Sequence, residues 1–206
     1  MKTKQLDYII PELVISTKVA IIGSSAMLLD TDYGKLIDTY DTIIRFNRAP
    51  VVGYEKHVGS KTTIRVANAD TFSNTKVVDT RFPNADQTYP QYFISKQESI
   101  SVIHANDNPN GWDNSSEHIH STSNAFLLSR MLGIEVPGRP TVGLLTISLL
   151  LINNIVPHLF GFGLHEKSAA THYWAKRDTT SVCHNYSEER DYIKYLLTEE
   201  KVKVFV

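Results

Sequence analysis

Two histidines in the last third of the chain are residues that acid–base chemistry could use. His172 is followed by two aromatic residues, in the run His172-Tyr173-Trp174, and His184 begins the polar run His184–Glu189. A neutral imidazole can accept a proton as a base, and an imidazole can also donate a hydrogen bond to a phosphate. The pattern suits a site in which one histidine is the base and the other contacts a phosphate. By spacing alone, ordinary surface or core histidines explain such a pattern more often.

A glycine turn follows the first apolar run of the chain. The run Val19–Ile22 leads directly into Gly23, Ser24 and Ser25. In many α/β folds, a buried strand that ends in such a turn places backbone N–H groups against a nucleotide. The turn lacks the later glycines of a dinucleotide fingerprint and the Gly-Lys-Ser/Thr of a phosphate-binding loop. A dehydrogenase or an NTPase is therefore a poor interpretation, and a simple tight turn stays open as the alternative.

Three patterns resemble metal sites, and we expect none of them to hold a metal. Asp30-Thr31-Asp32 has the Asp-x-Asp form that holds a divalent ion on a diphosphate, but it precedes an expected helix, where acidic residues cap and complement the helix dipole. Asn106–Glu117 has the skeleton of a calcium loop, but it begins with Asn and contains Pro109. His118 and His120 alternate without a clear third ligand.

Short apolar runs dominate the chain and predict its strands. The expected strands are Val19–Ile22, Thr42–Phe46, Thr63–Ala67, Ser101–His104, Leu159–Phe162 and Val202–Val206. Runs that are apolar on both faces are typical of a parallel sheet covered by helices on both sides. Helices are expected over 33–40, 123–132, 142–153 and 187–197, the last with Ser187 as its N-cap. This alternation predicts an α/β fold with a single, doubly wound, mostly parallel sheet flanked by helices.

Length and composition fit one globular domain over residues 1–206, with 42% hydrophobic and 21% charged residues. A net charge of −1 excludes nucleic-acid binding through bulk positive charge. The single cysteine, Cys183, excludes an internal disulfide and fits a reducing compartment. The most apolar stretch, Gly143–Ile152, is too short to span a bilayer, and the start of the chain lacks the apolar core of a signal peptide. We therefore expect a cytoplasmic protein, which could work at the inner face of the membrane.

The segment 70–124 differs from the rest of the chain. It is rich in polar and aromatic residues and has weak periodicity. Such segments are typical of long loops that carry recognition rather than core. We expect this loop-rich region to lie over the face of the sheet and to carry substrate recognition.

Four ordered motifs resemble those of the eukaryotic-type sialyltransferases, glycosyltransferase family 29. Val19–Asn68 is similar to the large motif of that family, and Pro140–Gly163 is similar to its small motif. His172-Tyr173-Trp174 resembles the third motif, and His184 with Glu189 fits the very small motif, His-x4-Glu. Together the four matches extend over residues 19–189.

The resemblance implies a metal-independent, inverting glycosyltransferase with a variant of the GT-A fold, which uses a CMP-activated sugar acid and needs no further cofactor. In that picture His184 is the general base on the acceptor hydroxyl, and His172 hydrogen-bonds the phosphate as it leaves. Glu189 lies five residues after His184, a spacing that does not put both on one helix face, so we expect it to support the site or contact the substrate. The nucleotide would contact Gly23, Ser24, Ser25, Asn47, Thr141, Val142, Gly143, Gly163 and Tyr173. The expected partners are a CMP-sugar donor and an oligosaccharide or glycolipid acceptor, with no nucleic acid. With such an acceptor, the loop-rich segment 70–124 becomes the expected acceptor-side region.

The chain departs from the family pattern at several positions. Family members usually have Asn at the positions of Ser24 and Met27, and an acidic residue at that of Ala175. Sialic acid is the donor sugar that the resemblance favours. Kdo, another CMP-activated sugar acid, stays open, because the large and small motifs mainly describe the nucleotide end. A non-catalytic module that binds CMP or a glycan is the alternative from another class of protein.

Overall fold

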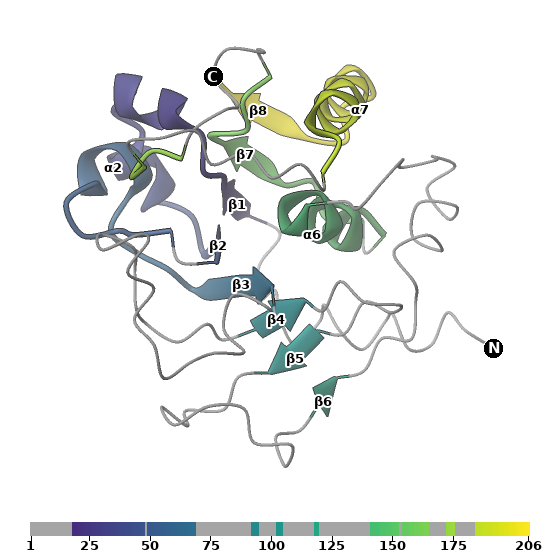
Figure 1. The fold of residues 1–206 in the computed structure, drawn as a ribbon, viewed down its shortest axis with the longest axis horizontal. Helices are drawn as coiled ribbons and strands as arrows, with labels where there is room; N and C mark the ends of the chain where they lie inside the picture. Colours follow the sequence, from purple (N-terminus) through teal and green to yellow (C-terminus); the bar gives the residue numbers. More distant parts are fainter. Residues whose placement is uncertain are drawn as a thin grey trace.

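The computed structural model describes residues 18–47, 49–68, 92–94, 102–104, 118–119, 141–152, 154–164, 172–175 and 184–206. One sheet of eight strands, in the order β6-β5-β4-β3-β2-β1-β7-β8, organises them (Figure 1). The strands are β1 (Val19–Ile22), β2 (Thr42–Phe46), β3 (Ile64–Asn68), β4 (Tyr92–Ile94), β5 (Val102–His104), β6 (His118–Ile119), β7 (His158–Phe160) and β8 (Lys203–Phe205). The helices are the 3₁₀ turn η1 (Ala26–Asp30), α2 (Gly34–Ile37), α3 (Glu55–Val58), α6 (Val142–Ile152) and α7 (Tyr186–Thr198).

Strand β1 is the centre from which the chain builds the sheet in two directions. It pairs in parallel with β2 on one side and with β7 on the other. The parallel pairing continues through β3 and β4 in one direction and to β8 in the other. The order therefore reverses between β1 and β7. In open α/β sheets, ligands bind outside the carboxyl ends of the strands at such a switch point.

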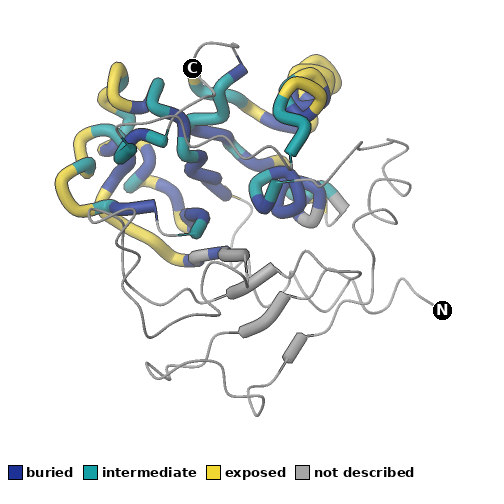
Figure 2. Tube along the Cα trace, in the orientation of Figure 1, coloured by how far each residue is buried: buried dark blue, intermediate teal, exposed yellow. Residues whose placement is uncertain are grey.

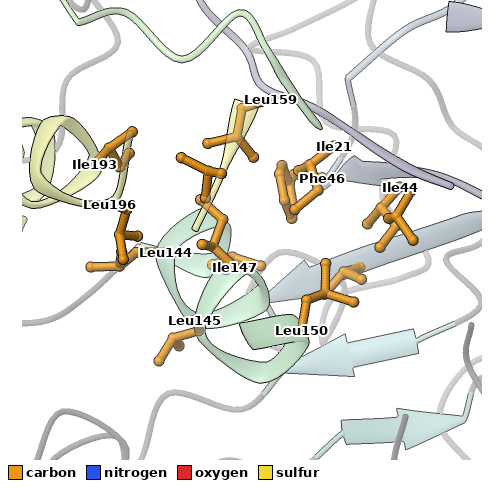
Figure 3. Close-up of a cluster of buried hydrophobic side chains, with 14 of the residues drawn as sticks. Ile21, Ile44, Phe46, Leu144, Leu145, Ile147, Leu150, Leu159, Ile193 and Leu196 are labelled. Carbon is orange, nitrogen blue, oxygen red and sulfur yellow. The ribbon is translucent and has the colours of Figure 1, made fainter. Parts of the chain in front are cut away.

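The central strands of the sheet are covered on both faces, as their continuous apolar runs predict. Successive side chains of a strand point to opposite faces, so Val19 and Ile21 of β1 join one core cluster and Ala20 and Ile22 join the other. The first cluster packs under α6 and α7, and Figure 3 shows Leu144, Leu150 and their neighbours against the strands. The second lies under η1, α2 and α3. Figure 2 shows β1 and β2 buried and the outer side of α7 exposed.

The predicted α/β class and the mostly parallel sheet are confirmed, and several local expectations are corrected. The described residues of the segment 70–124 form β4 to β6, with β5 antiparallel to both of its neighbours, so this segment extends the sheet. Helix α7 begins at Tyr186, and its N-cap is Asn185, whose side chain accepts from the N–H of Glu188 at 3.4 Å. The predicted cap, Ser187, instead lies in the first turn of α7.

The helix expected over 33–40 is a single turn, α2. Asp38, at its end, accepts hydrogen bonds from the N–H groups of Ser60 and Lys61 at 2.8 and 3.0 Å, so its side chain holds the loop before β3. Burial raises the pKa of Asp38, but the bonds from Ser60 and Lys61 and the Lys61 charge outweigh it, so the net pKa is lowered. The expected helix over 123–132 and the calcium-like pattern Asn106–Glu117 lie outside the described residues. Within the described residues, no helix has the length and apolar character that crossing a bilayer requires.

Candidate functional site

A pocket of about 220 Å³ lies at the carboxyl ends of β1, β2 and β7, at the switch point of the sheet. It is bounded by the turns after these strands and by the N-terminal ends of α6 and α7. Its described lining consists of Gly23, Ser24, Ser25, Phe46, Asn47, Thr141, Val142, Gly143, Gly161, Phe162, Gly163, His172, His184, Tyr186, Glu189, Arg190 and Ile193.

The floor of the pocket is made by the two turns that follow β1 and β7. The N–H of Gly23 donates to the carbonyl of Phe160 at 2.7 Å, and the N–H of Ser25 donates to that of Gly161 at 3.1 Å. A Cβ at Gly23 would lie 2.4 Å from the Gly161 oxygen, so only glycine lets the two turns approach this closely. These two N–H groups are thus used inside the protein, which corrects the expectation that they face a nucleotide. Ser24, half-buried between them, stays at the pocket surface.

His172 is held beside the β1 turn by backbone pairing. Ser25 and His172 form an isolated antiparallel bridge, and the N–H of Tyr173 donates to the Ser24 carbonyl at 2.9 Å. Burial lowers the pKa of the His172 imidazole below its ordinary value of 6.5, so the ring is neutral at neutral pH in the free protein. A neutral ring still donates one hydrogen bond and accepts another.

Glu189 is buried and binds Thr141 through both carboxylate oxygens. Its Oε1 accepts from the Thr141 N–H at 2.7 Å, and its Oε2 accepts from the Thr141 hydroxyl at 2.6 Å. The same hydroxyl oxygen accepts from the N–H of Leu144 at 3.1 Å, as an N-cap of α6 does. Glu189 therefore fixes the start of α6 against α7, and it does so from inside the pocket.

The pocket-facing side of α7 follows helical spacing. Tyr186, Arg190 and Ile193 are separated by four and three residues, so they share a face of the helix, and all three line the pocket. His184 lies before the N-cap of this helix, with its ring 5.6 Å from that of Tyr186. Because His184 is outside the helix, the helix-face argument does not separate it from Glu189, and both line the same pocket.

Asn47 reaches the pocket from the end of β2. Its φ of 46° is in the left-handed region, which Asn tolerates better than most residues. Its N–H donates to the Val66 carbonyl of β3 at 2.9 Å, so the turn is fixed to the neighbouring strand. The left-handed turn ends β2 at the pocket edge.

The structure brings together every predicted site residue except Tyr173. The Tyr173 ring is buried in the second core cluster, and its hydroxyl donates to the Pro50 carbonyl. This residue therefore supports the site from within the core. Met27 lies outside the pocket and lines a separate small cavity next to Val206. Six lining residues were not predicted from the sequence: Phe46, Gly161, Phe162, Tyr186, Arg190 and Ile193. The last three share one face of α7, so their helical spacing was a signal that could have identified them.

Among the described residues, no group of three or more His, Cys, Asp or Glu side chains could hold a metal. Asp30 ends η1, and Asp32 forms an exposed ion pair with Lys56 at 3.0 Å. The prediction that these aspartates cap the next helix is wrong, since α2 has Tyr33 at its N-cap position and no acidic residue in its first turn.

Comparison with known proteins identifies relatives along the whole described chain. The model of glycosyltransferase family 29 (sialyltransferase) matches residues 16–201. The CMP-N-acetylneuraminate-beta-galactosamide-alpha-2,3-sialyltransferase 4 of Rattus norvegicus is 29% identical over 96% of this chain and 67% of its own length. The CMP-N-acetylneuraminate-beta-galactosamide-alpha-2,3-sialyltransferase 1 of Mus musculus is 28% identical over 94% of this chain and 60% of its own length. The chain thus spans about two thirds of the length of these relatives.

A solved structure agrees with this assignment at the level of the fold. The crystal structure of a mammalian sialyltransferase superimposes with a TM-score of 0.56 and 23% identity, covering 99% of this chain and 77% of that one. The family match covers strands β1 to β7, both helices of the pocket and all four motifs. The chain therefore belongs to glycosyltransferase family 29, the sialyltransferase family.

Proposed function

We propose that this domain transfers sialic acid from CMP-sialic acid to a glycan hydroxyl, with inversion and without a metal, on a GT-A-like variant of the α/β fold. One observation carries the proposal: a single pocket at the switch point of the sheet contains His172, His184 and the start of α6. The names of the relatives describe CMP-N-acetylneuraminate donors and β-galactosamide acceptors, which supports the same donor here.

The nucleotide end of the donor has a suitable partner in the N-terminus of α6. The positive end of a helix dipole and its first N–H groups favour an anion. Glu189 uses the Thr141 N–H, and the next N–H groups along the helix are those of Val142 and Gly143, both of which line the pocket. Asn47 and Ser24 add polar side chains to the lining of the same pocket. We assign these four residues to the nucleotide.

The transfer step makes two chemical demands. The transition state resembles an oxocarbenium ion, so the acceptor hydroxyl must lose its proton while the CMP phosphate leaves. His184 is the general base in this proposal. His172, held beside Ser24 and Ser25 by its backbone, donates a hydrogen bond to the departing phosphate.

The proposal needs no divalent ion, because CMP leaves as a phosphate monoester without a diphosphate to chelate. The test is transfer activity in EDTA, which should stay within a few-fold of its starting value. Complete loss of activity that manganese restores would indicate a metal site at Asp30 and Asp32. Restoration by calcium would indicate a site at Asn106–Glu117.

The donor experiment tests the proposal directly. The protein is incubated with CMP-sialic acid or CMP-Kdo together with glycans ending in β-galactose, and CMP release is compared with and without the glycan. Glycan-dependent release from CMP-sialic acid supports the proposal, and release from CMP-Kdo alone replaces the donor sugar with Kdo. CMP binding without any turnover would identify a non-catalytic module. Failure to bind CMP at all would overturn the proposal.

A further inference from the structure

The imidazole of His172 lies flat against the indole of Trp174. Their ring centroids are 4.5 Å apart and their planes differ by 15°. Trp174 is half-buried and packs against the second core cluster, whereas His172 lines the pocket. The indole of Trp174 therefore packs against one face of the His172 imidazole, and His172 also borders the open pocket.

Within the described residues, His172 has no polar anchor for its ring. Its Nδ1 atom is buried and lacks a hydrogen-bond partner there, and the same holds for Nε1 of Trp174. A functional histidine is commonly oriented by a carbonyl or carboxylate on the nitrogen that does not react. Here the contact that fixes the plane of the imidazole is the aromatic stack.

The indole is itself held firmly enough to serve as a support. Tyr173 meets it edge-on, with centroids 4.6 Å apart, and the Tyr173 ring meets Tyr54 in the same way at 5.0 Å. The Tyr173 hydroxyl is bound to the Pro50 carbonyl. The N–H of Ala175 donates to the His172 carbonyl at 2.9 Å, which closes the turn containing both stacked residues. With the backbone fixed, the remaining freedom of His172 is in its side-chain torsions, and a flat neighbour restricts them.

We propose that Trp174 is a positioning residue that holds the His172 imidazole edge-on to the pocket, so that it can meet the phosphate of the donor. The inference rests on the proposed function, because it assumes that His172 contacts that phosphate. It assigns to the third residue of the His-Tyr-Trp run a mechanical role that acts only through His172.

The test separates the phosphate from the rest of the nucleotide. Affinities for CMP and for cytidine are measured for the wild type, W174L and W174F, and the ratio of the two reports the phosphate contact. We expect W174L to lower CMP affinity by about tenfold and to leave cytidine affinity within about twofold, because one charge-assisted hydrogen bond is misaligned. W174F keeps a flat aromatic face and should keep most of the ratio. Y33F, which loses a comparable hydroxyl bond, to the Val206 carbonyl, and does not line the pocket, is the matched control and should resemble the wild type in this ratio.

A double-mutant cycle shows whether Trp174 acts through His172. In an H172A background, W174L should have no additional effect on the ratio. If W174L unfolds, the cycle is run with W174F and W174H. The NMR signals of the His172 ring protons provide a second measurement. The indole of Trp174 shifts these signals upfield, and the phenyl ring of W174F should preserve part of that shift. Equal loss of CMP and cytidine binding, or additive effects in the cycle, would overturn the inference. A wild type that does not prefer CMP to cytidine would instead overturn the proposed function.

Discussion

Both carboxylate oxygens of Glu189 accept hydrogen bonds from one residue, Thr141, at 2.7 and 2.6 Å. The two residues are far apart in the chain, one at the start of α6 and the other in the first turn of α7. The carboxylate is buried, and the charge it brings lies at the positive end of the α6 dipole, where an anion is stabilised. The pair therefore joins the two helices that form one wall of the pocket.

Replacing Glu189 should loosen this wall. We expect E189A to reduce the free energy of unfolding by about 1–3 kcal/mol, because it leaves the Thr141 N–H and hydroxyl without their partner. CMP affinity should fall as well, since Val142 and Gly143 follow Thr141 at the pocket. Denaturant unfolding and CMP titration measure the two effects. The control is E188A, which changes an exposed residue of the same turn. Equal results for E188A and E189A would contradict the role given to Glu189.

The two pocket histidines should respond differently to truncation. H184A should lower the turnover rate by about 10²–10⁴-fold, the usual range for a lost general base, while CMP affinity stays nearly unchanged. H172A should weaken both turnover and CMP affinity, since it removes a charge-assisted hydrogen bond worth about 1.5–3 kcal/mol. Steady-state kinetics and calorimetric CMP titration distinguish them. If H184A loses more CMP affinity than H172A, the assigned roles are reversed.

Among the described residues that line the pocket, Arg190 is the only lysine or arginine. Because the proposed donor carries an anionic phosphate and carboxylate, R190Q should weaken CMP-sugar binding, and the loss should shrink as salt increases. R190K should retain part of the affinity. K194Q removes the same charge from an exposed position on α7 and is the matched control. Binding to R190Q that equals binding to K194Q at low salt would exclude this contribution.

Acidification should destabilise the fold through two histidines. Burial lowers the pKa of His172, and burial together with Lys203 and Lys18 lowers that of His158. As pH falls below about 6.5, the unfolded chain takes up protons at these sites before the folded protein does, so the free energy of unfolding decreases. This contribution is complete above about pH 6.5 and is lost toward the lowered pKa values.

The measurement is denaturant unfolding between about pH 5 and 8, the range in which histidine titrates. H158Q and H172Q should each flatten the slope of unfolding free energy against pH. The exposed acid E199Q is a charge-change control that should leave this slope as it is. Unchanged slopes in both histidine variants would show that other groups dominate.

The fold class could be read from the order of residues because it depends on local patterns. Runs such as Val19–Ile22 and Thr42–Phe46 are apolar on both faces, and a strand buried on both faces belongs in a helix-covered parallel sheet. The helix over Val142–Ile152 was equally visible as a long apolar segment. The ends of helices were harder to predict where a contact with a distant part of the chain determines them. The turn α2 ends at Asp38, which binds the loop at Ser60 and Lys61.

The candidate site was predictable as a set of residues but not as an arrangement. The motif resemblance named eleven of the seventeen residues in the described lining, because each of these keeps its place relative to Gly23, Thr141, His172 or His184 in the chain. What those residues bind in the protein was decided only by tertiary structure. The strand order that puts β7 beside β1 uses the Gly23 and Ser25 N–H groups for internal bonds. The same packing brings Glu189 to Thr141 and turns Tyr173 into the core. Sequence spacing fixes which side chains share an element, whereas contacts between elements depend on how the sheet is ordered and how its two cores pack.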